Sequence, residues 1–146
     1  MTPPLLPETL MLSAIAIPFA AAALIPLFHH RPNLRELITL SAAAMLVVVV
    51  WSLVGSVLDG ARPERHVLEI VPGFVLAFAI EPLGMLFALV ASALWIVNSV
   101  YSIGYMRGND EPHQTRFYVC FALALAATMG IAFSANLLTL FLFYEL

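Results

Sequence analysis

Long apolar runs without charge recur along this chain and predict its main elements. An α-helix needs about 20 apolar residues to cross a bilayer core about 30 Å thick. Three runs meet this need, and a fourth extends over 117–144 with a small polar break at Ser134-Ala135-Asn136. The pattern therefore predicts four transmembrane helices plus the first half of a fifth, at about 9–28, 37–58, 82–106, 117–133 and 136–146.

The first apolar run has a competing interpretation, a cleaved signal peptide. Such a peptide has a basic start and an apolar core of about 7–15 residues. Residues 1–8 hold Glu8 and no arginine, and the run 9–28 is longer than that core. We therefore expect this run to be a transmembrane helix.

The longer connection at 59–81 carries its own pattern. Residues 66–71 and 74–80 are rich in β-branched and aromatic side chains and flank Pro72-Gly73. Pro followed by Gly suits the two central positions of a type II turn. We expect a short extracytoplasmic β-hairpin lying on the helix bundle. The alternative is an early, irregular start to the third helix, but Glu81-Pro82 is typical of a helix N-terminus.

Composition supports a membrane protein and excludes other classes. The chain is 62% hydrophobic and only 10% charged, whereas an ordinary soluble domain carries roughly 25% charged residues. Disorder requires low hydrophobicity and high charge, and a net charge of −3 offers no basic patch for nucleic acid. The fold class we expect is an all-α polytopic membrane protein in the lipid bilayer, with 1–146 belonging to one transmembrane domain.

Arginines set the expected orientation, because short cytoplasmic loops are rich in Lys and Arg. The short connections after the first and third helices carry Arg31, Arg35, Arg107 and Arg116. The segment 59–81 has two arginines diluted by acidic residues. We therefore expect a multi-pass protein of the cell (inner or plasma) membrane whose N-terminus is extracytoplasmic.

Glu145 is the leading candidate for chemistry. If the fifth helix begins near Asn136, a preferred N-cap type, nine residues of rise place Glu145 about 13–14 Å into the bilayer. Acids at such depth usually face a bundle interior and mark ion or proton paths. We therefore expect a proton-transfer role. The alternative is that Glu145 is incidental, because it lies near the chain end.

Polar residues also form a stripe on the third helix. Ser92, Ser99 and Ser102 share one face with Trp95, and Asn98 lies on the adjacent face. These residues are candidates for a polar relay (Ser92, Asn98, Ser99, Ser102), although interhelical hydrogen bonding is the interpretation we prefer. No metal site or cofactor is expected, since the adjacent His29-His30 pair lacks a third ligand.

The fourth helix carries small residues at four-residue spacing, Ala122, Ala126 and Gly130. Such spacing lets two helices approach closely. We therefore expect this face to serve packing rather than chemistry.

Four stretches recur together in a known family: EPLGMLFA from Glu81, YSIGYMRG from Tyr101, Arg116-Phe-Tyr, and NLLTLFLFYE from Asn136. With them the chain resembles the antiporter-like membrane subunits, a superfamily that includes Mrp-type cation/proton antiporter subunits and the proton-pumping subunits of respiratory complex I and membrane-bound hydrogenases. The Phe-Tyr-Glu ending is most similar to the D-like branch of the Mrp subunits. The resemblance is good over about 59–146 and weaker over the first two helices.

The resemblance implies ion translocation within a larger complex, with other membrane subunits as partners and protons and sodium as the ions. In the family, a glutamate on the fifth helix pairs with a lysine on the seventh. Glu145 matches the glutamate, whereas this chain contains no lysine. We therefore expect an N-terminal fragment of a longer protein.

Three functions follow as hypotheses. The first is an Mrp-type monovalent cation/proton antiporter subunit. The second is a proton-pumping subunit of a complex I-like or hydrogenase complex, which would make the chain part of a NADH-quinone oxidoreductase-like enzyme although it has no catalytic constellation of its own. The third is a structural membrane module that transports nothing.

Overall fold

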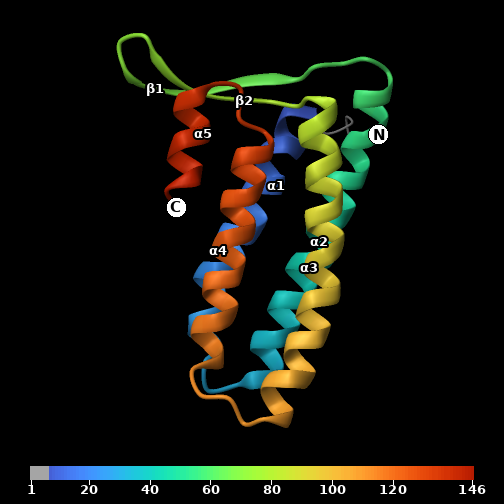
Figure 1. Ribbon diagram of the computed structural model, residues 1–146, viewed down its shortest axis with the longest axis vertical. Helices are drawn as coiled ribbons and strands as arrows, with labels where there is room; N and C mark the ends of the chain where they lie inside the picture. The colour runs from blue at the N-terminus through green and yellow to red at the C-terminus, as the bar shows by residue number, and fades with distance from the viewer. Residues whose placement is uncertain (1–6) are drawn as a thin grey trace, which may run out of the picture.

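The computed structural model describes residues 7–146, with only the backbone described for Ile70 and Val71. Its elements follow one another in a helical bundle interrupted by one hairpin (Figure 1). They are α1 (Pro7–Leu24), a 3-10 helix η1 (Ile25–Phe28), α2 (Pro32–Leu58), β1 (Glu64–Val71), β2 (Phe74–Ala79), α3 (Pro82–Gly108), α4 (Gln114–Ala132) and α5 (Leu137–Tyr144).

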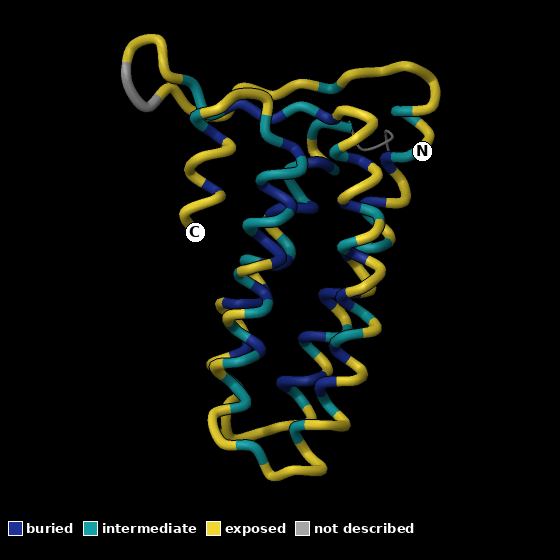
Figure 2. The backbone as a smooth tube through the Cα atoms, in the orientation of Figure 1, coloured by how far each residue is buried: buried dark blue, intermediate teal, exposed yellow. Residues whose placement is uncertain are grey.

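The four long helices form a closed ring. Helix α1 packs against α2 and α4, and α3 packs against the same two helices. Buried side chains line the inside of this ring along its length (Figure 2). The largest fully buried ones include Met11, Leu46, Trp95 and Tyr118, one from each long helix.

The outer surface of the ring is apolar. Large hydrophobic side chains such as Val48, Trp51, Leu83 and Val97 are more than 60% exposed. Within residues 7–146, four helices are long and apolar enough to cross a membrane. Exposed apolar faces of this extent suit contact with lipid rather than with water, as the sequence predicts.

The helix boundaries differ from the expected ones in two instructive places. The α-helical part of the first span ends at Leu24, and a 3-10 turn follows, because Pro26 has no amide hydrogen and its ring disfavours a continuing α-helix. The second helix begins at Pro32 rather than at 37. The charge-free criterion placed the start after Arg35 and Glu36. The helix begins earlier because proline is well suited to a first helical turn.

The other helix ends differ by a few residues. Helix α3 extends to Gly108 and α4 begins at Gln114, both inside stretches that the charge-free criterion excluded. Helix α3 does begin at Pro82 after Glu81, although the Glu81 side chain makes no capping hydrogen bond. Helix α5 ends at Tyr144.

The predicted β-hairpin is present. Strand β1 begins two residues earlier than expected and pairs antiparallel with β2, from Glu64 opposite Ala79 to Val71 opposite Phe74. Gly73 has φ +87°, the left-handed value that the third position of a type II turn requires. The Glu69 carboxylate accepts a hydrogen bond from the Gly73 amide at 2.9 Å, which supports the turn.

Strand β2 is the part of the hairpin that contacts the end of the helix bundle. The Ala79 amide donates to the Phe133 carbonyl at 2.8 Å, and the Ala135 amide donates to the Ala77 carbonyl at 3.0 Å. The α4–α5 connection thus meets β2 at an isolated antiparallel bridge between Ser134 and Phe78. The side chains of Phe78, in β2, and Ile80, directly after it, are almost fully buried.

The two ends of the bundle carry different connections (Figure 1). The hairpin, the start of α1 and the α4–α5 connection lie at one end. The α1–α2 and α3–α4 connections lie at the opposite end. An ion pair between Arg65 of β1 and Glu8 of α1, at 2.9 Å, joins two of the elements at the hairpin end.

Candidate functional site

Helix α5 places Glu145 within the height of the bundle. Asn136 is the N-cap, as expected, and its side-chain oxygen accepts from the Thr139 amide at 2.8 Å. The helix then descends beside α4 from the hairpin end (Figure 1). Eight helical residues correspond to about 12 Å of rise, so Glu145, the C-cap residue, lies about 12 Å along the helix axis from its start.

Glu145 itself is exposed in the described chain. Its backbone amide donates to the Phe141 carbonyl at 3.1 Å, which continues the helical pattern to this residue. In the described chain, the Glu145 side chain is therefore not packed into the core that the four long helices enclose. The proton-transfer role of Glu145 stays a prediction.

Phe143, two residues earlier, anchors α5 to the bundle. Its side chain is 7% exposed, and its ring lies 5.7 Å from that of Phe78 and 6.4 Å from that of Phe19, centroid to centroid. It also packs directly on Gly130 of α4. The small residue at 130 thus permits close approach of α4 and α5, as the spacing of small residues predicts.

The polar stripe on α3 is buried. Ser92, Trp95, Ser99 and Ser102 are each at most 5% exposed. The Ser92 hydroxyl donates to the Leu89 carbonyl of its own helix at 3.0 Å, so for this residue the interhelical interpretation is wrong. Within the described part of the chain, the Ser99 hydroxyl and the Trp95 indole nitrogen have no hydrogen-bond partner.

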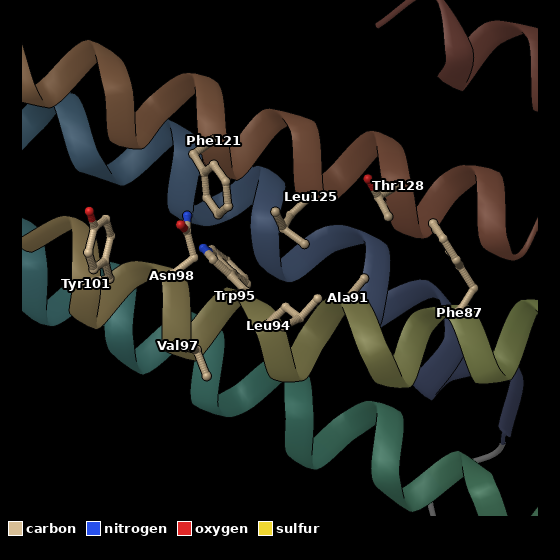
Figure 3. A pocket seen from close by; sticks show the side chains of 10 residues that line it. All are labelled: Phe87, Ala91, Leu94, Trp95, Val97, Asn98, Tyr101, Phe121, Leu125 and Thr128. Atoms are coloured by element: carbon tan, nitrogen blue, oxygen red, sulfur yellow. The ribbon is translucent and has the colours of Figure 1, made fainter.

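Asn98 lies in a different environment from the serines. It is half-buried and lines an apolar cavity of about 640 Å³ between α3 and α4, together with Trp95 and Thr128. Figure 3 shows Asn98 and Trp95 extending from α3 toward α4. Trp95 shares a face of α3 with the serines and also lines this cavity. The cavity therefore lies next to the polar stripe.

The structure does not bring Glu145 and the polar stripe together. Helix α5 packs against α4 and β2, whereas the stripe lies inside the ring on α3. A proton passing between them must therefore cross or go around α4.

A charged cluster at the opposite end of the bundle was missed by the sequence analysis. The Arg107 guanidinium donates to both oxygens of Glu36, at 2.9 and 2.6 Å, and also to Asn33. Glu36 is 6% exposed and Arg35 is 4% exposed. The Arg35 guanidinium lies 3.6 Å from the Glu36 carboxylate.

Arg35 connects this cluster to the start of α4. It donates to the side chains of Thr115 at 3.1 Å and Gln114 at 2.7 Å, and its guanidinium carbon lies 5.1 Å from the centre of the Tyr118 ring. The Tyr118 hydroxyl is buried and, among residues 7–146, has no hydrogen-bond partner. The cluster thus ties together α2, α3 and α4.

The sequence contained one signal for this cluster. Pro32 is a favourable first helical residue, and a helix starting there makes Arg35 and Glu36 its fourth and fifth residues. Arginine placement along the chain indicates orientation, but it does not reveal which carboxylates the arginines pair with in the fold. In the described residues, no group of three His, Cys, Asp or Glu side chains is close enough to hold a metal ion.

Together, four helices long and apolar enough to span a membrane, with lipid-suited outer faces around a largely apolar core, define a multi-pass helical membrane protein. No known family profile matches the chain. It is similar to the Na(+)/H(+) antiporter subunit A1 of Staphylococcus aureus, with 28% identity over 138 residues, and equally to that subunit in strains JH9 and Newman. The match covers 91% of this chain and 17% of each relative.

This similarity confirms the resemblance to antiporter-like membrane subunits. The chain spans about 17% of the length of these relatives. They are A1 subunits, and the finer resemblance to the D-like branch stays a prediction.

Proposed function

We propose that this chain contributes to proton/cation translocation as part of a multi-subunit, Mrp-type monovalent cation/proton antiporter. The observation that carries the proposal is the similarity to an Na(+)/H(+) antiporter subunit over 91% of the chain. The four spanning helices and the intramembrane acid Glu145 are in keeping with it. Other membrane subunits are the expected partners, and protons and sodium the expected ions.

Glu145 is the residue to which we assign proton transfer. A carboxyl group in a low-dielectric region favours its neutral form, and a nearby cation favours its charged form. A glutamate between these influences takes up a proton when the cation moves away and releases it when the cation returns. The cationic partner would come from a segment outside this chain, because the sequence holds no lysine and its arginines lie toward the helix ends.

We assign the polar stripe of α3 a supporting role as a relay. Water could bridge the buried Ser99 hydroxyl and Trp95 indole, which lack protein partners among the described residues. Asn98 borders the adjacent cavity. Such a hydrated line would carry protons along the bundle axis within the ring, on the other side of α4 from the helix that holds Glu145.

We further propose that the hairpin end is extracytoplasmic and that the membrane is the plasma membrane. Arg31, Arg35, Arg107 and Arg116 all belong to the end opposite the hairpin. Clustered arginines in short connections favour the cytoplasmic side.

Everted membrane vesicles from cells that make the full-length protein with its partner subunits test the proposal. A pH-sensitive dye reports a proton gradient that is formed first, and sodium is then added. We expect sodium to dissipate the gradient, and to fail to do so in vesicles lacking the protein. A gradient that forms only on addition of an electron donor would instead favour a complex I-like or hydrogenase subunit. An assembled complex that moves no protons under either condition would favour the third hypothesis, a structural membrane module that transports nothing.

A further inference from the structure

A polar cavity of about 570 Å³ opens at the bundle end opposite the hairpin. Pro26 and His29 border it from the end of the first span, Arg35 from α2, and residues of the α3–α4 connection and the start of α4 from the other side. The cavity lies where the apolar spans end, which is the depth of lipid headgroups.

Positive charge at this cavity exceeds negative charge. Glu36 already accepts two hydrogen bonds from Arg107, so its carboxylate balances only one of the two guanidinium groups beside it. Arg35 is 4% exposed, and its Nε is buried and has no partner among the described residues. A buried guanidinium with an unused donor is costly unless an anion completes its contacts.

The start of α4 points to the same ligand chemistry. Gln114, Thr115 and Arg116, its first three residues, all line the cavity. The N-cap residue His113 makes no side-chain capping hydrogen bond, so no side chain occupies that position in the first turn. The Arg116 amide donates to the His113 carbonyl at 2.9 Å, so the Gln114 and Thr115 amides and the helix dipole are what make this terminus favourable for a phosphate.

We propose that this cavity binds the phosphate group of a phospholipid headgroup, with Arg35 and the first turn of α4 as its principal donors. Basic pockets between transmembrane helices are typical sites for anionic headgroups, and arginine suits phosphate because its planar fork donates two parallel hydrogen bonds. Arg116, which is exposed, supplies a second positive charge at the rim. Glu111, the carboxylate in the lining, can accept from a headgroup amine or hydroxyl beside the phosphate.

Native mass spectrometry of the full-length protein, extracted with its partner subunits in mild detergent, tests this site by counting retained phospholipids. We expect Arg35→Gln to lower the retention of one phospholipid by about tenfold or more, because charged hydrogen bonds are lost. Arg62→Gln is the matched control, since Arg62 is exposed at the hairpin end and, among residues 7–146, its side chain donates only to the adjacent Ala61 carbonyl. The Arg62→Gln variant should retain as much phospholipid as the wild type.

A second variant keeps the test decisive if Arg35→Gln does not fold. Arg116→Gln changes an exposed residue of the lining and should also lower retention of that phospholipid. Unchanged retention in the folded variants would overturn the proposal. Added inorganic phosphate distinguishes a lipid from a free ion: we expect it not to displace the phospholipid, and displacement would show that the cavity takes free phosphate instead. None of these outcomes depends on whether the protein transports ions.

Discussion

The guanidinium of Arg107 donates hydrogen bonds to both carboxylate oxygens of Glu36, which lies 71 residues earlier in the chain. This pair joins α3 to α2 at the bundle end opposite the hairpin. Arg35, beside it, joins α2 to α4. Three of the four long helices, α2, α3 and α4, are therefore joined at that end by polar and charged residues that the sequence pattern assigns to loops.

Glu36→Gln should destabilise this end of the bundle. The substitution leaves the buried Arg35 without a carboxylate at 3.6 Å, and breaking a buried ion pair from one side is strongly unfavourable. We expect the free energy of unfolding in detergent to fall by about 3 kcal/mol. Asp59→Asn is the control, because Asp59 is exposed at the other end. Equal stability of the two variants would contradict the structural role of the cluster.

Gly130→Ala should disturb the packing of α5. A Cβ at this position would overlap the Phe143 ring, whereas a Cβ at Gly104 would meet no atom within 4 Å. We expect Gly130→Ala to cost about 1–3 kcal/mol of stability through overpacking. Gly104→Ala should be neutral or stabilising by up to about 1 kcal/mol, since alanine favours a helix.

Thermal unfolding of both glycine variants in detergent checks this contrast. Replacing Phe143 with a smaller leucine in the Gly130→Ala background should restore part of the loss. If Gly130→Ala is as stable as Gly104→Ala, α5 does not pack on α4 as described.

Thr139→Val should weaken the link between the hairpin and α5. The buried Thr139 hydroxyl accepts from the Ala77 amide of β2 at 3.0 Å, and valine fills similar space without an acceptor. Leaving that buried amide unpaired costs about 1–3 kcal/mol. Thr139→Ser keeps the hydroxyl and should lose less. Faster hydrogen exchange at Ala77 in the valine variant alone would confirm the contact, and equal exchange in both would contradict it.

Cysteine labelling tests the proposed orientation. In a Cys120→Ala background, which removes the native cysteine, Arg62→Cys and His30→Cys place single thiols at opposite ends of the bundle. A maleimide that cannot cross membranes should label position 62 in intact cells and label position 30 only after permeabilisation. The reverse pattern would place the hairpin end in the cytoplasm.

Much of the fold could be predicted from the sequence because lipid imposes simple demands. Charge-free runs located the four spanning helices, and Pro72-Gly73 located the hairpin turn. Helix ends were less accurate, since a helix continues past the apolar core wherever charges find partners. Arg35 and Glu36 illustrate this, because they lie inside α2 and are paired with groups from α3 and α4.

The candidate site could be predicted only in part. Residue spacing placed Ser92, Ser99 and Ser102 on one buried face, because helical periodicity fixes which residues share a face. Spacing within one helix cannot reveal that Asn98 borders a cavity shared with α4, nor that Arg107 reaches Glu36. Such contacts depend on how helices distant in sequence pack against one another.

Proton flux measured after Glu145→Gln tests the central claim most directly. Glutamine keeps the shape of the side chain but cannot release a proton. In everted vesicles containing the full-length protein and its partner subunits, we expect sodium-driven proton movement to fall by about tenfold or more, with subunit assembly unchanged. Glu64→Gln, an exposed carboxylate of the hairpin, should leave the flux at the wild-type level. Wild-type flux in an assembled Glu145→Gln complex would contradict the account.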